Sequence, residues 1–235
     1  MSIIIDRTIE LEDLTMHYRE VGEAGAPPLI LLHGLTSNAQ DWDEITPMLA
    51  ERYHVFALDQ RGHGTSTRPE AYSFELMRDD VKEFADKLSL DHFTLIGHSM
   101  GGTIAFLFAE KYPERLERLV LEDTPPPFIG MMDPNSPEPP AEAPEAVPFD
   151  WPVLTSIIKQ LRNPDPTWWN DQRKITAPTL IIAGGSTSHV PQEKLAEVTA
   201  MIPNCQLVTI EGAGHEVHKN RPEEYKEILQ SFLFS

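Results

Sequence analysis

Short apolar runs alternate with helical patterns along most of this chain, and this alternation limits its fold more than any other feature. The runs are continuous in hydrophobicity, which is typical of strands buried on both faces of a sheet. Helical patterns fall between the runs, and the clearest of them, 74–88, places apolar residues at three-to-four spacing. The predicted strands are 29–32, 53–58, 93–96, 119–121, 179–183 and 206–210, and the predicted helices are 74–88, 100–111, 192–201 and 222–233. This order predicts an α/β fold with a mostly parallel sheet covered by helices on both faces.

Two features frame this alternating core. Residues 3–9 and 14–20 read as two short strands joined by a tight turn, which predicts an antiparallel start to the sheet. Residues 125–152 hold ten prolines, Pro134 among them, and these exclude a continuous helix or a central strand there. A short helical stretch follows near 154–161. We therefore expect residues 1–124 and 176–235 to form the core, and 125–175 to be an insertion over one edge of the sheet.

The net charge of the chain limits the kinds of molecule that it can bind. Nineteen basic against 37 acidic residues give a net charge of −18. Such a surface repels phosphate backbones and anionic bilayers, so we expect neither nucleic-acid nor membrane binding. The one cysteine, Cys205, excludes an internal disulfide. The N-terminal apolar stretch is too short for a signal peptide, and no run is long enough to span a membrane. These features predict a cytoplasmic protein, and they leave its oligomeric state unknown.

The strongest chemical signal is the segment from Gly97 to Gly102, which reads Gly-His-Ser-Met-Gly-Gly. It follows a predicted strand and precedes a predicted helix. A serine in such a turn takes a strained backbone, and its hydroxyl projects at the carboxyl edge of the sheet. Glycines at 97 and 101 are needed because side chains there would collide across the turn. Ser99 is therefore the predicted nucleophile.

A serine nucleophile needs a base and a site for the developing negative charge. His215 follows two glycines in a loop after the last predicted strand, so it is the predicted base. The backbone N–H groups of Leu35 and Met100 are the predicted oxyanion hole. His33, which opens the same turn as Leu35, is a candidate accessory residue, although we expect its ring to be structural. The histidines that compete with His215 are His17, His54, His63, His92, His98, His189 and His218.

These motifs occur in the order of a known family. The serine elbow, the His33-Gly34 turn, the segment 59–66 and the late glycine-histidine loop together resemble the α/β-hydrolase superfamily, in its short esterase-like branch. The resemblance covers about residues 15–124 and 176–234. It implies an eight-stranded sheet, a Ser-Asp-His order of the triad and a cap over the site, here 125–175. Dehalogenases and epoxide hydrolases of this family carry an aspartate in place of Ser99, so a serine there indicates acyl transfer.

The acid of the triad departs from the commonest family pattern. In most relatives it follows the strand that corresponds to 179–183, but the loop 184–191 here has hydroxyl groups and no carboxylate. Asp123 follows the preceding strand, and some branches of the family resemble this arrangement. Glu122 and Asp123 should point to opposite faces of the sheet, so only one can serve. We predict Asp123, with Thr187 or Ser188 as a hydrogen-bonding accessory; the alternative for Asp123 is a capping role.

The remaining expectations concern the substrate. Four tryptophans are candidates for lining the pocket or for forming a small core of their own: Trp42, Trp151, Trp168 and Trp169. No spacing typical of a metal site or of a nucleotide-binding loop occurs, so we expect no metal and no cofactor. The predicted activity is a carboxylesterase acting on small-molecule esters with short or medium acyl groups. The alternatives are a lactonase, a carbon–carbon bond hydrolase, and a slow-turnover ligand receptor of the same superfamily.

Overall fold

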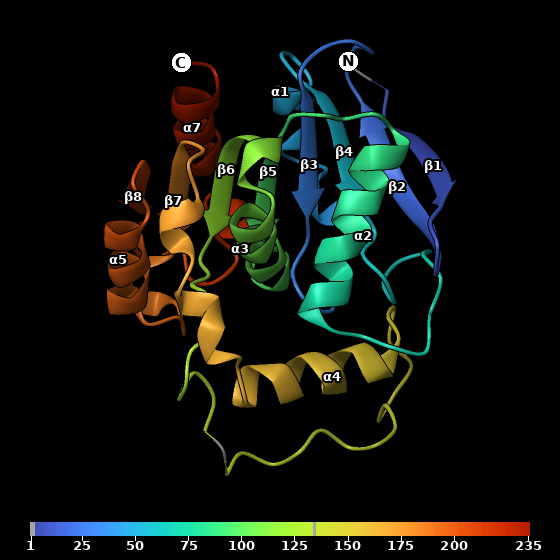
Figure 1. The fold of residues 1–235 in the computed structure, drawn as a ribbon, viewed down its shortest axis with the longest axis vertical. Helices are drawn as coiled ribbons and strands as arrows, with labels where there is room; N and C mark the ends of the chain where they lie inside the picture. Colours follow the sequence, from blue (N-terminus) through green and yellow to red (C-terminus); the bar gives the residue numbers. More distant parts are fainter. Residues whose placement is uncertain (1–2, 134) are drawn as a thin grey trace.

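A sheet of eight strands forms the centre of the computed structural model, which describes residues 3–133 and 135–235 (Figure 1). Pro134, which was counted in the proline-rich segment, lies outside the described residues. The strands are β1 Ile5–Glu10, β2 Thr15–Val21, β3 Pro28–Leu32, β4 His54–Leu58, β5 Phe93–His98, β6 Leu116–Glu122, β7 Thr179–Ala183 and β8 Cys205–Thr209. The helices are α1 Thr46–Leu49, α2 Phe74–Lys87, α3 Met100–Lys111, α4 Trp151–Arg162, α5 Gln192–Met201, α6 Val217–Asn220 and α7 Pro222–Leu233.

The order of the strands is β1-β2-β4-β3-β5-β6-β7-β8. β1 and β2 pair antiparallel, as do β2 and β4, and the other pairs are parallel. The expected antiparallel start and the mostly parallel sheet are therefore confirmed. Because the carboxyl ends of parallel strands meet at one edge, the loops after β3, β5, β6, β7 and β8 gather there.

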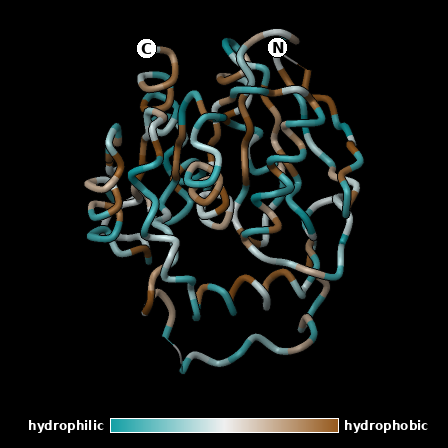
Figure 2. Tube along the Cα trace, viewed as in Figure 1, coloured by the Kyte–Doolittle hydropathy of each residue, from teal (hydrophilic) through white to brown (hydrophobic). Residues whose placement is uncertain are grey.

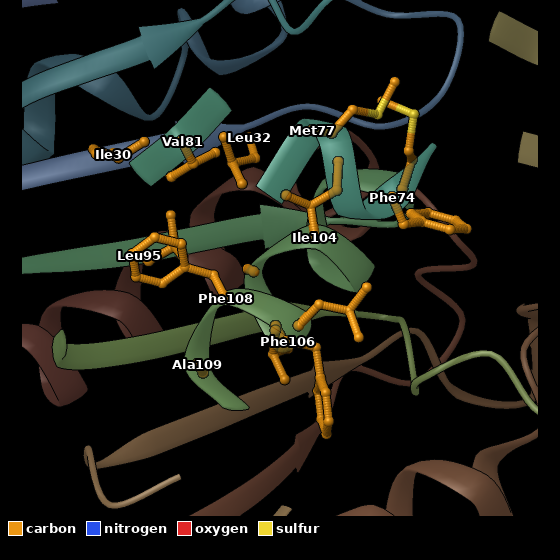
Figure 3. Packing of buried hydrophobic residues seen from close by; sticks show 14 of the residues in the cluster. Ile30, Leu32, Phe74, Met77, Val81, Leu95, Ile104, Phe106, Phe108 and Ala109 are labelled. Atoms are coloured by element: carbon orange, nitrogen blue, oxygen red, sulfur yellow. The ribbon is translucent and has the colours of Figure 1, made fainter. Parts of the chain in front are cut away.

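Each face of the sheet carries its own apolar cluster. Ile30 and Leu32 of β3 point to the side covered by α2, α3 and α5, whereas Leu29 and Leu31 point to the side covered by α1 and α7. Figure 3 shows side chains of β3, β5, α2 and α3 packed together in the first cluster. All four of these β3 residues are fully buried, which explains why the strand reads as a continuous apolar run. Figure 2 shows the same concentration of apolar residues along the central strands.

Helix α3 is buried on every side. All its residues from Met100 to Ala109 are buried, so this helix is apolar all round instead of amphipathic. Its N-terminal residue follows Ser99 directly, and Ser99 makes no side-chain cap. The first backbone N–H groups of α3 are therefore left without intrahelical acceptors at the carboxyl edge of the sheet.

The segment between β6 and β7 crosses that edge (Figure 1). α4 begins at Trp151, three residues earlier than expected, because a proline is tolerated in the first turn of a helix. The segment is fastened to the core near α2. The Tyr72 hydroxyl is 2.5 Å from Asp150 Oδ2, and Gln160 accepts from the N–H of Phe74 at 2.9 Å. We call residues 125–175 the cap.

Among residues 3–133 and 135–235, no helix combines the length and the apolar character that crossing a bilayer requires.

Candidate active site

Ser99 lies in the sharp turn between β5 and α3. Its backbone has φ 52° and ψ −117°, a conformation that a residue with a side chain adopts only under strain. A Cβ on Gly97 would lie 2.3 Å from the carbonyl oxygen of Gly101, and one on Gly101 would lie 2.3 Å from that of Leu32. These glycines therefore let α3 start directly against the strands, which presents the Ser99 side chain at the edge of the sheet.

One chain of hydrogen bonds joins the three residues predicted to act together. Ser99 Oγ is 2.9 Å from His215 Nε2, and His215 Nδ1 is 2.9 Å from Asp123 Oδ2. β5 and β6 are parallel neighbours, so the residues that follow them, Ser99 and Asp123, lie side by side. When Nδ1–H donates to the carboxylate, Nε2 is left as an acceptor for the hydroxyl proton. This arrangement can activate the hydroxyl as a nucleophile.

The loop after β7 supplies donors to Asp123 in place of a carboxylate of its own. The N–H of Gly184 donates to Asp123 Oδ1 at 2.8 Å, and the Ser188 hydroxyl donates to Oδ2. Asp123 is fully buried, and its carboxylate is held both by the loop after β7 and by His215. Of the two accessory candidates, Ser188 contacts the acid, whereas the Thr187 side chain is exposed.

The predicted oxyanion hole lies beside the serine. Met100 is the first residue of α3, and its N–H has no intrahelical acceptor. Leu35 and Met100 both line the cavity that contains Ser99. The ring of His33, by contrast, is buried, with Nδ1 2.8 Å from the carbonyl oxygen of Gly34 and Nε2 accepting from the N–H of Gln60 at 3.1 Å. Burial lowers the pKa of His33 to about 4, so its ring is neutral and holds the turn together.

A cavity of about 90 Å³ opens over Ser99. Apolar side chains make most of its wall, and three of them, Met131, Ile157 and Leu161, come from the cap. In the part of the chain that the structure describes, no lysine or arginine lines this cavity. The remaining lining residues are Leu35, Phe74, Met100, Thr103, Asp123, Thr124, His189, Val190 and His215.

The tryptophans named as pocket candidates lie elsewhere, which corrects that expectation. Trp42 is fully buried on the other face of the sheet and stacks on His218 at 4.6 Å between ring centroids. Trp151 donates from Nε1 to the carbonyl oxygen of Pro140 within the cap. Sequence reasoning missed His189, whose ring centroid lies 4.2 Å from that of His215. Its position just after Ser188 in the loop that serves Asp123 was the available signal.

Comparison with known proteins places the fold in a family. A family model described as the alpha/beta hydrolase fold matches residues 27–167, more than half of the chain. The chain belongs to this family. Its expected membership of the superfamily and its expected architecture are thereby confirmed.

The relatives are hydrolases of several kinds. The chain is 26% identical to the sn-1-specific diacylglycerol lipase ABHD11 of Mus musculus, over 95% of this chain and 87% of that protein. It is 28% identical to a putative esterase/lipase of Haemophilus influenzae, over 88% and 83%. The crystal structure of E-2-(acetamidomethylene)succinate hydrolase superposes with a TM-score of 0.85 at 25% identity, covering 99% of this chain and all of that one. Together these relatives support hydrolase activity.

Proposed function

We propose that this protein is a serine carboxylesterase that cleaves esters of small or medium acyl groups through an acyl-enzyme. The observation that carries the proposal is the unbroken chain of 2.9 Å hydrogen bonds from Ser99 through His215 to the buried Asp123. Ester hydrolysis by such a chain needs no cofactor. Two relatives whose names describe lipase or esterase activity add support.

The proposed reaction has two halves. His215 takes the Ser99 proton as Oγ attacks the ester carbonyl, and the N–H groups of Leu35 and Met100 stabilise the oxyanion. His215 then gives the proton to the leaving alcohol. In the second half His215 takes a proton from water as the water oxygen attacks the acyl carbon, and it returns that proton to Ser99 Oγ when the ester bond breaks and the acid is released. Asp123 keeps the imidazole in the required tautomer and stabilises it when it is charged.

The cavity supports a small, uncharged acyl group. Its volume of about 90 Å³ is well below the roughly 300–1,000 Å³ of pockets that take drug-sized ligands. Its apolar wall suits a short hydrocarbon chain. Among the described residues no cationic side chain lines it, so a carboxylate on the substrate would be desolvated without a partner. We therefore favour neutral esters over the acidic substrates that the name of the succinate hydrolase describes.

The experiment combines active-site labelling with a substrate panel. Wild-type protein should react with a fluorophosphonate probe and should hydrolyse p-nitrophenyl acetate and butyrate faster than lactones or diketones. Ser99→Ala should abolish labelling and lower kcat/KM by about 10⁶-fold with the melting temperature preserved. Ser186→Ala is the matched control, because Ser186 is an exposed serine on the neighbouring loop.

Each failure points to a different alternative. Equal activity of Ser99→Ala and wild type on esters would refute the proposal. Labelling without turnover would favour the ligand receptor. Faster cleavage of lactones or diketones would favour the other hydrolases. The cytoplasmic location stays a prediction, which cell fractionation would test.

A further inference from the structure

A second group of buried polar side chains lies behind the Ser99–His215–Asp123 chain. His98 and Glu122 are register partners on the adjacent strands β5 and β6, so they lie next to each other across the ladder. Each precedes a residue of the proposed triad, Ser99 or Asp123. His218 follows His215 by three residues. Glu122 is fully buried, and His218 and His98 are nearly so.

Glu122 fixes the start of α6. It accepts from the backbone N–H of His218 at 3.0 Å, and its two oxygens lie 2.8 and 2.9 Å from His218 Nδ1. On the other side of the ring, His218 Nε2 is 3.6 Å from Asp41 Oδ2. Trp42 stacks on the same ring. His218, three positions after His215, is therefore held through its backbone N–H and its Nδ1 by Glu122, and one face of its ring is covered by Trp42.

His98 fixes the backbone of His215 itself. His98 Nε2 is 2.9 Å from the carbonyl oxygen of His215, so this nitrogen carries the proton and donates. Burial lowers the pKa of His98, which keeps the ring neutral and leaves Nδ1 unprotonated. The loop that carries His215 contains Gly212 and Gly214, both at positive φ, and so has little stiffness of its own.

From these contacts we propose that His98, Glu122 and His218 form a positioning network, which holds the His215 imidazole within hydrogen-bonding distance of Ser99. The proposal rests on the proposed esterase function and deepens it. None of the three side chains lines the cavity among the residues described, so they act on the reaction only through the place of His215.

The side chains around the network indicate that its charged groups do more than stabilise the fold. The side chains around His218 on this face of the sheet are largely apolar, including Val217, Tyr225 and Leu229. A buried ion pair in such a setting stabilises a fold no better than apolar side chains of similar size. An apolar pair would fill the same volume, but it would give up the anchor for the His218 N–H. Positioning accounts for the charges where stability alone does not.

The charge state of the network can be read from the groups that face His218. The carboxylates are Glu122 from β6 and Asp41 from the turn 39–42. The other groups are His98 from β5, Tyr225 from α7, and Lys219, which pairs with Asp41. Burial opposes the charge, but the two carboxylates raise the pKa of His218 to about 9. Burial likewise opposes ionisation of Glu122, yet His218 holds its pKa at about 2. The ion pair is therefore complete at neutral pH and is lost when His218 deprotonates.

The test compares matched variants at His98. His98→Leu removes the donor to His215, whereas His98→Gln keeps an N–H donor on a side chain of similar reach. With p-nitrophenyl acetate we expect His98→Leu to lower kcat by on the order of 10²-fold with KM unchanged, because a small displacement of the base is enough. His98→Gln should recover most of that loss. Equal kcat values for His98→Leu and wild type would overturn the proposal.

A second pair of measurements guards against misfolding. Loss of one partner leaves the other charge buried, so Glu122→Leu or His218→Leu alone will be strongly destabilised. The double variant Glu122→Leu/His218→Leu removes both charges and should remain folded. A purely structural role predicts wild-type kcat for this folded variant. The proposal predicts a kcat lowered at least tenfold and a loss of the decline in kcat between pH 8 and 10 that wild type should show.

The failure of the esterase function itself would be visible separately. Proton NMR reports the low-field His215 Nδ1–H resonance, which depends on the His215–Asp123 hydrogen bond and requires no turnover. That resonance should be present in wild type and His98→Gln and be broadened or lost in His98→Leu. If wild type hydrolyses no ester, this signal still decides the network: the same resonance in all three proteins would refute it.

Discussion

The residues at the strand ends and the residues of the cap contribute to the site in opposite ways. Ser99 and Asp123 follow adjacent parallel strands, so the sheet ladder fixes their backbones. Among the described residues 125–133 and 135–150, the cap has no helix or strand, and Asp150 and Gln160 fasten it to the core near α4. The strand ends fix the positions of the Ser99 and Asp123 side chains, whereas the cap forms part of the cavity wall. Substitutions at the strand ends should therefore change the rate, whereas substitutions in the cap should change which substrate fits.

After the loss of Ser99 itself, the largest expected effect also comes from the strand ends. Asp123→Asn should lower kcat/KM on p-nitrophenyl acetate by about 10⁴-fold, since an amide favours the wrong imidazole tautomer. Steady-state kinetics with a matched melting curve measure this. Asp165→Asn is the control in the cap, because Asp165 caps only a turn there. Full activity of Asp123→Asn would mean that another residue is the acid. The strand ends would then not control the rate as proposed.

A cap substitution should act on substrate choice and on stability. Ile157 is buried and lines the cavity, so Ile157→Ala should enlarge the space for the acyl group and reduce the free energy of unfolding by about 2–5 kcal/mol. We expect the optimum in a series of p-nitrophenyl esters from acetate to octanoate to move towards longer chains. An unchanged optimum in the folded variant would mean that the acyl group does not contact α4.

The buried pair behind the strand ends predicts a pH effect that cap residues should not share. The folded pKa of His218, about 9, lies above its ordinary 6.5, so its stabilisation is complete below about pH 6.5 and is lost as pH rises through 9. Glu122 has the reverse sign, since its pKa of about 2 lies below 4.5 and its stabilisation is lost only as pH falls through 2. Urea unfolding should therefore show stability falling from pH 7 to 10. The Glu122→Leu/His218→Leu double variant should show a flatter profile, and Ile157→Ala an unaltered slope.

The smallest expected effect concerns the loop that serves Asp123. Ser188→Ala removes a hydroxyl donor to the buried carboxylate but leaves the Gly184 N–H in place. One such charge-assisted bond is worth about 1.5–3 kcal/mol, so kcat/KM should fall by about 10- to 150-fold. Thr187→Ala is the matched control, because the Thr187 side chain is exposed. Equal losses in both variants would assign the effect to the loop as a whole.

The core elements could be predicted because their signals are local. Apolar runs gave the six strands β3 to β8, three-to-four spacing gave α2, and the segments between the runs gave α3, α5 and α7 close to their observed bounds. The pairing of Ser99, His215 and Asp123 also followed, since each stands directly after a strand or in a loop that leaves one. The short helices α1 and α6 were not predicted, because four residues are too few to show the 3.6-residue period of a helix.

The contacts that could not be predicted from the sequence are those between elements far apart in the chain. Trp42 was a candidate for the pocket because aromatic residues suit pockets, but which face of the sheet a turn packs against cannot be read from its sequence. From the sequence, His218 was only a histidine that lies after the glycine loop. Its partner Glu122 was considered only as an alternative to Asp123. Alternation correctly separated Glu122 from Asp123, yet it could not say what lay on the far face. The cap lining, including Met131, depends on where an irregular segment crosses the sheet.

The left-handed backbone at Ser99 and Asp123 has a consequence for anyone who wishes to make this protein more heat-resistant. Each of the two non-glycine residues stores strain of about 1–3 kcal/mol. At Asp123 glycine would also leave the Gly184 N–H without its acceptor, but at position 99 it would release the strain and raise the melting temperature, while removing the proposed nucleophile. Heat resistance and the proposed catalysis therefore place opposite demands on the residue at position 99, and a screen for heat tolerance alone should select for loss of the proposed nucleophile.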